Sequence, residues 1–244
     1  MLFPHLHKAL VVTCNAKMNS PTTIELKNID SEDIDDVLRK VEKSFGFRFG
    51  DTELKDVKTF GELCDIISKK VQGDNSNDCT TQQAYYKVRS AIADTLLIDK
   101  NIIRPDTDLE QLFPRHNRRE KIKELQNKLG LAIDILDIKA WLGWTIFSGI
   151  ILSLVMFFSK WQFALCGLAF FISVGWTANK FFAKEFKIKT VAQLTEKIAR
   201  ENYLKARRNS ATINRNEIAQ KVKELFRHDL DLEDNALTRE ATFV

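Results

Sequence analysis

Apolar residues recur along much of this chain at the three- and four-residue spacing of amphipathic helices. The clearest face is formed by Ile34, Val37, Leu38, Val41 and Phe45. Their spacing predicts a helix that Asp30 or Ser31 caps. Further faces of this kind are formed by Tyr85, Val88, Ile92 and Leu96, by Ile122, Leu125 and Leu129, by Val191, Leu194 and Ile198, and by Ile218, Val222, Leu225 and Phe226. Because no strand-like alternation accompanies them, we predict an all-α protein.

Two long apolar runs stand apart from these amphipathic segments. Residues 141–159 carry no charge, and residues 161–178 contain Gln162 as their only strongly polar residue, with Lys160 between the runs. As a helix, the first run would be roughly 28 Å long, close to the thickness of a bilayer core. The expected interface anchors are Trp141, Trp144, Trp161 and Trp176. We therefore predict a transmembrane hairpin over 141–178, the alternative being a buried helical hairpin.

Basic residues are concentrated on the two outer sides of this hairpin. They are Arg118, Arg119, Lys121, Lys123, Lys128 and Lys139 before it and Lys180, Lys184, Lys187, Lys189 and Lys197 after it. Lys160 alone marks the turn. This asymmetry predicts a multi-pass protein of a bacterial inner (cytoplasmic) membrane, with the lipid bilayer as a partner and both termini in the cytoplasm.

A self-similarity brackets the hairpin. Residues 57–67 (VKTFGELCDII) reappear as residues 188–198 (IKTVAQLTEKI), and the upstream block 45–49 (FGFRF) corresponds to 129–133 (LGLAI). In the first copy the two blocks are a few residues apart, whereas the hairpin separates them in the second. We infer a duplicated unit whose second copy was opened by an insertion.

The two ends of the chain also correspond to parts of this unit. Residues 222–243 align without gaps on residues 88–109. The first copy lacks a preceding helix, and residues 216–244 supply an apolar face that needs cover. We therefore predict that residues 216–244 pack against residues 30–71, either within one chain or by exchange in a domain-swapped homodimer.

Several of these segments resemble acyl carrier proteins. Residues 88–99 (VRSAIADTLLID) and 103–109 (IRPDTDL) resemble the first helix and long loop of that family, and residues 45–63 resemble its later helices. The resemblance covers most of the chain outside the hairpin. It implies small four-helix bundles that bind partners through their second helix and, in active members, a phosphopantetheine arm on a serine that follows aspartate.

Ser31, after Asp30, is the residue of the first unit that matches this attachment serine. Glu32 replaces the usual apolar residue after it, and the corresponding stretch of the second unit, Arg115–Asn117, offers no serine. The alternative is that Asp30 and Ser31 only form a helix N-cap, followed by acids that suit the helix dipole.

The predicted fold is therefore all-α, with acyl-carrier-like bundles, one of them split between the chain ends, and a transmembrane hairpin. The predicted parts are an arm at 1–29, a half-domain at 30–71, a linker at 72–83, a second carrier-like domain at 84–140 and 179–208, the hairpin at 141–178 and the completing segment at 216–244. We expect a non-catalytic, membrane-anchored module that binds or scaffolds unidentified protein partners without a cofactor. The alternative is a carrier with phosphopantetheine on Ser31 that serves acyl or lipid transfer.

Other chemistry is not indicated. The formal net charge is only +4, and the basic segments lack interleaved aromatic residues, so we expect no nucleic acid partner. The four cysteines have no CxxC spacing, and His5, His7, His116 and His228 are scattered, which argues against a metal site. No nucleophile, base and acid set suggests an enzyme.

The first seventeen residues allow two interpretations. The run Leu10–Cys14 faintly resembles a lipoprotein cleavage site, but it is short, and Pro4 interrupts the leader. Met18 opens a polar run before the first helix. Residues 1–17 are therefore expected to be a flexible arm or to lie outside the native protein.

Overall fold

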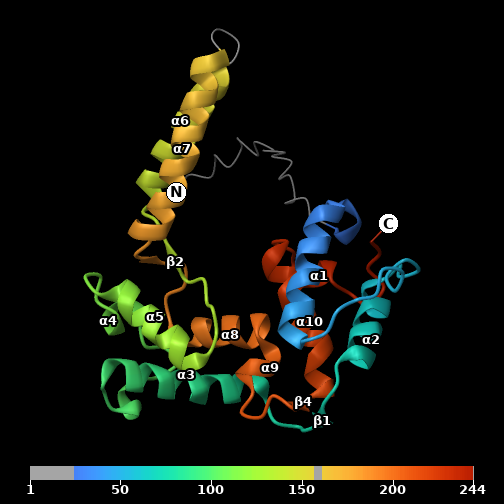
Figure 1. The fold of residues 1–244 in the computed structure, drawn as a ribbon. Helices are drawn as coiled ribbons and strands as arrows, with labels where there is room; N and C mark the ends of the chain where they lie inside the picture. The colour runs from blue at the N-terminus through green and yellow to red at the C-terminus, as the bar shows by residue number, and fades with distance from the viewer. Residues whose placement is uncertain (1–24, 157–160, 244) are drawn as a thin grey trace, which may run out of the picture.

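The computed structural model describes residues 25–156 and 161–243, without the side chains of 161, 163–164 and 179–182. The predictions that concern residues 1–24, Lys160 and the Trp161 side chain lie outside the described residues. Within them the protein is mostly helical, with two hydrophobic cores below a long helical hairpin (Figure 1).

The helices and strands follow one another in a largely α-helical order. The elements of the first core are η1 (Leu26–Asn28), α1 (Ser31–Phe45), α2 (Phe60–Lys70), α10 (Arg215–Asp229) and η3 (Asp234–Ala236). Those of the second core are α3 (Thr80–Leu96), η2 (Lys100–Ile102), α4 (Leu109–Leu112), α5 (Arg118–Leu129) and α8 (Val191–Glu201). α9 (Tyr203–Ala206) contributes to both, and the hairpin consists of α6 (Ala140–Met156) and α7 (Trp161–Phe182).

The described part of the chain also contains four short strands, which the sequence analysis did not predict. β1 (Asp74–Asn75) pairs in parallel with β4 (Thr212–Ile213), and β2 (Leu136–Asp137) pairs antiparallel with β3 (Glu185–Phe186). The first pair ties the linker between the cores to the segment that returns to the first core. The second closes the base of the hairpin. Each strand has two residues, too few to show an alternating pattern.

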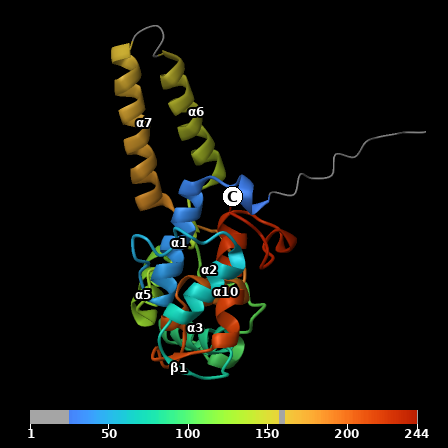
Figure 2. The ribbon, with the colours of Figure 1, turned by 90° about the vertical axis from the view of Figure 1, so that its right-hand side faces the viewer.

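The first core is built from two segments that are far apart in the sequence, residues 26–71 and residues 203–243. α10 packs against α1 and α2, and the ring of Phe226 lies edge-on against Phe60 at 5.3 Å between centroids. The ring centroids of Phe45 and Tyr203 are 4.9 Å apart. Figure 2 shows α1, α2 and α10 side by side. Residues 216–243 therefore lie against residues 30–71 within one chain, as the sequence predicted for 216–244.

Equivalent backbone hydrogen bonds recur in the two cores. Phe60 N donates to Ala241 O at 2.8 Å, and at the matching place Val191 N donates to Thr107 O at 3.1 Å. The same holds for the bond from Phe243 N to Lys58 O and that from Leu109 N to Lys189 O. The residues that form these bonds in one core are thus aligned with those that form them in the other. This holds for both sequence alignments, 57–67 with 188–198 and 222–243 with 88–109.

The helix ends repeat as well. α2 begins with a capping box of Thr59 and Glu62, and α8 begins with one of Thr190 and Gln193. A capping box satisfies two free amides at a helix start. α1 and α5 both end at a glycine in the left-handed region, where a residue without Cβ avoids strain. The sequence repeat is therefore also a structural repeat.

Arg207 links the two segments that connect the cores, one before α3 and one before α10. Its side chain is only 1% exposed. Its Nη1 donates to Asp78 O at 3.2 Å and to Thr80 Oγ1 at 2.5 Å, and its Nε donates to Thr212 Oγ1 at 3.2 Å. These three bonds offset part of the cost of burying the guanidinium, although its Nη2 has no hydrogen-bond partner among the described residues. Arg207 therefore holds the start of α3 against the strand that leads into α10.

The hairpin corrects the main prediction from the sequence. Among the described residues, no helix combines the length and the apolar character needed to cross a membrane. α6 has 17 residues, about 26 Å of helix against a bilayer core of about 30 Å. α7 has 22 residues, but its apolar stretch is bounded by Gln162 and Lys180.

The predicted transmembrane hairpin and the multi-pass inner-membrane location are therefore wrong. The role of membrane anchors given to the tryptophans loses its basis. Trp141, Trp144 and Trp176 are exposed on the hairpin. The two helices pack through a small residue, because the ring of Phe171 fills the space where Gly149 lacks a side chain.

Candidate functional site

Ser31 lies at the first position of α1 and is exposed. The side chain of Asp30 caps the helix, since its Oδ1 accepts a hydrogen bond from Glu32 N at 3.1 Å. The Ser31 hydroxyl instead donates to the same Asp30 oxygen over 3.5 Å, which is long for such a bond. Of the two residues that the sequence allowed as a cap, Asp30 therefore takes the role. The Ser31 hydroxyl is left at the surface.

An apolar groove of about 210 Å³ opens beside Ser31, and we call it the first groove. Its apolar lining consists of Ile34, Leu38, Leu54, Val57, Leu63 and Phe243. Leu63 belongs to the buried core, whereas Ile34 and Leu38 are half-buried on the face of α1 that follows Ser31. Asp35 lies at its edge. The groove is thus a small apolar hollow with a hydroxyl and a carboxylate at its rim.

The first groove needs both parts of the first core. Phe243 reaches it from the segment after η3, where Phe243 N donates to Lys58 O at 3.1 Å. Its ring lies 6.3 Å from that of Phe226 in α10. The sequence prediction of Ser31 did not include this lining. The alignment of Phe243 with Leu109, which is fully buried in the second core, was the signal that could have indicated it.

The surface around Ser31 is acidic. Glu32, Asp33 and Asp35 are exposed in the first turns of α1, and within the described part of the chain none of them has an ion-pair partner. Acids in the first turn interact favourably with the positive end of the helix dipole. The acids therefore stabilise α1 and also give the groove a negative rim.

The second core has no counterpart of the attachment serine. Counting back from Leu129 as from Phe45 places Arg115 where Ser31 stands, and Arg115 pairs with Glu185 at 2.5 Å. The next cation, Arg118, is buried, with Nε donating to Phe113 O at 2.9 Å and its guanidinium 4.5 Å from the ring centre of Phe186. At the start of α5, the side chains of Arg115 and Arg118 are therefore engaged in contacts within the protein.

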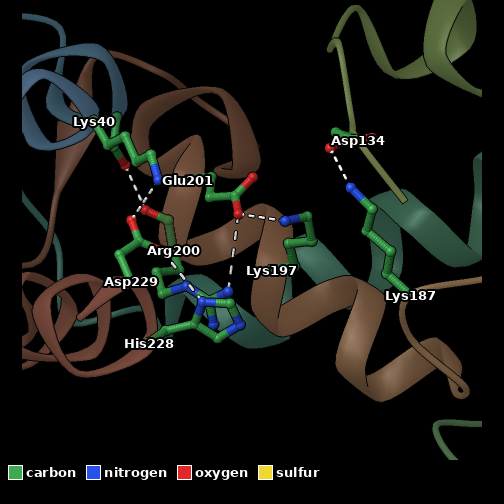
Figure 3. A network of polar contacts seen from close by, with 9 residues as sticks. Lys40, Asp134, Lys187, Lys197, Arg200, Glu201, His228 and Asp229 are labelled. Carbon is green, nitrogen blue, oxygen red and sulfur yellow. Dashed lines mark hydrogen bonds and ion pairs between the residues drawn. The ribbon is translucent and has the colours of Figure 1, made fainter. Parts of the chain in front are cut away.

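The other polar clusters have structural explanations. Figure 3 shows Lys40 of α1 paired with Asp229 of α10 at 3.0 Å, and His228 Nδ1 lying 3.2 Å from Asp229. In the same view Glu201 contacts Lys197 at 2.5 Å. The Lys40 pair connects α1 to α10, the His228 contact lies within α10, and the Lys197 pair connects adjacent turns of α8.

Metal and thiol chemistry find no arranged site in the part of the chain that the structure describes. No group of three or more histidine, cysteine, aspartate or glutamate side chains is placed to hold a metal there. Cys64 is buried, and burial raises the pKa of its thiol to about 12, so the reactive thiolate is scarce at neutral pH. Cys79 and Cys166 are exposed.

Comparisons of this chain with protein-family models, with curated proteins and with solved structures find no match. The resemblance to acyl carrier proteins therefore stays a prediction from the sequence. The function has to be argued from Ser31, the first groove and the charges around them.

Proposed function

We propose that this protein is a non-catalytic carrier module that holds an aliphatic group in the first groove, with Ser31 as the attachment point for phosphopantetheine. The observation that carries the proposal is the exposed Ser31 hydroxyl, which is not used as the helix cap and stands at the rim of an apolar groove. When attached, phosphopantetheine would supply a terminal thiol to which an acyl chain can be joined.

The residues around Ser31 fit such a role. Asp30 keeps α1 capped whatever happens to the Ser31 hydroxyl, because the capping bond uses the Asp30 carboxylate. Half-buried Ile34 and Leu38 offer apolar surface next to the attachment point. Covering such surface with a methylene chain is favourable by about 25 cal/mol per Å² of apolar area removed from water. Exposed Glu32 is the point at which this segment differs from the acyl carrier proteins that it resembles.

Loading of Ser31 is tested by incubating the purified protein with a phosphopantetheinyl transferase and coenzyme A. We expect the intact mass to rise by one phosphopantetheine group and peptide mapping to place it on Ser31. Ser31→Ala should abolish the increase, whereas Ser210→Ala, at another exposed serine, should leave it unchanged. No added group on Ser31, both here and in protein purified from its own host, would contradict the proposal.

A second measurement tests the groove itself. Loading from octanoyl-coenzyme A would deliver an eight-carbon chain on the arm, and loading from acetyl-coenzyme A a two-carbon chain. We expect methyl resonances of Ile34 and Leu38 to shift more with the octanoyl form, since only the longer chain can cover them. Equal spectra for the two loaded forms would show that the groove does not hold the chain.

A second candidate function is partner binding without an arm. It is favoured by the exposed acids Glu32, Asp33 and Asp35, which are free to meet a basic protein surface. In that case the triple variant E32Q/D33N/D35N should lose the partners that wild type forms on cross-linking in its host. Ser31→Ala should keep them. Loss of the same partners in Ser31→Ala would instead favour the carrier function.

A further inference from the structure

The hairpin exposes large apolar side chains on the face of α6 that points away from α7. α6 meets α7 through Gly149, against which the ring of Phe171 lies, and through Ser153, which lies against Gly167. Positions two and five residues from Gly149 fall on the opposite side of the helix. Those positions hold four exposed residues that we call the seam: Trp144, Phe147, Ile151 and Leu154. The seam has the three- and four-residue spacing of a coiled coil.

The outward face of α7 has a different character. It carries small and polar side chains at three- and four-residue spacing, all of them exposed: Gln162, Cys166, Ala169, Ser173 and Thr177. The hydroxyls of Ser173 and Thr177 donate to carbonyls of their own helix, Phe170 O at 2.7 Å and Ser173 O at 2.9 Å. Large apolar side chains therefore face outward on α6 rather than on α7.

The half of the seam nearer the cores is aromatic and borders a hollow. This hollow of about 310 Å³ is lined by Trp144 and Phe147 together with Ala140 and Gly143, all from α6. The two rings stand edge-on, with their centroids 6.0 Å apart. The other half of the seam, Ile151 and Leu154, is aliphatic. The seam thus has an open hollow towards one end and branched aliphatic side chains towards the other.

The exposed apolar surface of this face suits an interface of standard size. Trp141 and Val155 flank the seam, and the six side chains are 45–69% exposed. With full side-chain areas of about 150–250 Å², these fractions leave on the order of 700 Å² of apolar surface in each chain. An interface of standard size buries about 800 Å² per partner. Soluble proteins rarely leave a contiguous apolar patch of more than a few hundred Å² uncovered.

A second copy of the same chain matches this face in charge and in shape. Residues 141–156 carry no charge, so a charged partner surface would lose its water without gaining a counter-charge. The spacing of the seam, three, four and three residues, is the same from either end. An antiparallel copy therefore places its Leu154 opposite Trp144 and its Ile151 opposite Phe147. Aliphatic side chains then enter each hollow, whereas a parallel copy would set aromatic rings against aromatic rings.

We propose that the protein forms a homodimer in which the seams of two α6 helices pack antiparallel. A two-fold interface of this kind uses the same patch on both chains, which the symmetric spacing of the seam provides. Because the cores lie at one end of the hairpin, as Figure 1 shows, antiparallel packing places the cores of the two chains at opposite ends of the paired hairpins. The contact requires neither Ser31 nor an exchange of the chain ends.

Sedimentation velocity of the full chain over a range of concentrations tests the proposal. We expect the wild type to show a monomer–dimer equilibrium in detergent-free buffer. In I151Q/L154Q the dissociation constant should rise at least about tenfold, because polar groups enter the centre of the interface. The matched control L165Q/I172Q makes the same two replacements at exposed side chains of α7 and should leave the constant unchanged. All four side chains are exposed, so both variants are expected to fold, and circular dichroism checks this.

Cross-linking tests the orientation. Trp141→Cys and Val155→Cys place a thiol at either end of the face, in a chain whose Cys14, Cys79 and Cys166 are replaced by serine. In an antiparallel dimer the two positions meet, whereas in a parallel one they are about 21 Å apart along the helix. A disulfide between copies should therefore form on mixing the two variants and in neither variant alone.

Three results would overturn the proposal. The first is a wild-type chain that stays monomeric, with or without phosphatidylcholine vesicles. The second is equal weakening of the dimer by I151Q/L154Q and L165Q/I172Q, which would place the contact elsewhere on the hairpin. The third is a disulfide within either cysteine variant alone, or none in the mixture although both variants still sediment as dimers.

Discussion

The two cores share a backbone plan and differ at the start of one corresponding helix. α1 begins with Asp30 as its cap and an exposed Ser31, beside a groove with an acidic rim. α5 lacks a side-chain cap, and its first residue, Arg118, is buried against Phe186. The groove beside α5 has a basic rim. One fold thus presents two grooves of opposite charge.

This difference shows how little of a repeat must change to alter the charge of the surface beside one helix. The bonds that join α2 to the segment before Phe243 recur where α8 meets the segment before Leu109. These bonds involve backbone atoms, so they tolerate substitution on the surface of the neighbouring helix. The first turn of the corresponding helix can therefore be acidic in α1 and basic in α5, while the backbone bonds that close the core are kept.

The largest expected effect comes from opening one core and leaving the other intact. Phe226 is fully buried against Phe60, and Phe226→Ala should lower the free energy of unfolding of the first core by about 3–5 kcal/mol. Hydrogen exchange should then speed up in α1, α2 and α10 more than in α3 and α5. The matched variant Ile92→Ala, at the aligned position, should show the reverse pattern. Equal loss in both cores for both variants would contradict separate cores.

The next effect concerns the connection between the cores. Arg207→Ala leaves Thr80 Oγ1 without its donor and removes one of the two donors to Asp78 O, and it should cost about 1–3 kcal/mol in urea unfolding. Arg208→Ala, at the exposed neighbour, should stay within about 0.5 kcal/mol of wild type. If the two variants unfold at the same urea concentration, Arg207 does not fasten the connection.

A smaller effect separates Asp30 from Ser31. Asp30→Ala removes the cap of α1 and should cost about 1 kcal/mol, whereas Ser31→Ala should change stability by less than about 0.5 kcal/mol. Thermal unfolding of both variants measures the difference. A larger loss in Ser31→Ala would mean that the hydroxyl has a structural role and would weaken its assignment as an attachment point.

The smallest effect distinguishes the two capping boxes by pH. Hydrogen bonds from the Lys58 and Thr59 amides lower the pKa of Glu62, whereas Gln193 at the equivalent place does not titrate. A lowered folded-state pKa adds stability above the unfolded value of about 4.3, and that stability is lost as the pH falls through the folded value.

Acid should therefore weaken the α2 cap and leave the α8 cap unchanged. In E62Q, unfolding midpoints between neutral and acidic pH should depend less on pH than in wild type. Gln193→Glu should introduce an additional acid dependence in the second core. Identical pH profiles for wild type and E62Q would contradict this assignment.

Much of the helical repeat could be predicted from the sequence, because amphipathic helices show a regular spacing of apolar residues. Val41 and Val222 occupy predicted faces and are fully buried. The ungapped alignment of the last segment pointed to its place against α1 and α2. The apolar spacing and the alignment can both be identified in the sequence, without any information on distances between residues.

Other features depend on distances that no pattern contains. Asp30 and Ser31 are both chemically suited to cap a helix, and only the backbone geometry decides between them. Arg119 and Lys121 look alike in sequence, yet only Lys121 reaches Glu124. The hairpin prediction failed for another reason, since hydropathy counted residues 141–159 as one span, whereas the described helix α6 is Ala140–Met156.

Native-state hydrogen exchange of the unmodified chain, followed as a function of urea, tests the central claim most directly. The claim is that α10 closes the first core with α1 and α2. The slowest amides of α10, among them those of Val222 and Phe226, should then open with the same free energy and urea dependence as those of Val41 and Ile67. If α10 exchanges through a separate, weaker opening while α1 and α2 stay protected, the two ends of the chain do not form one core.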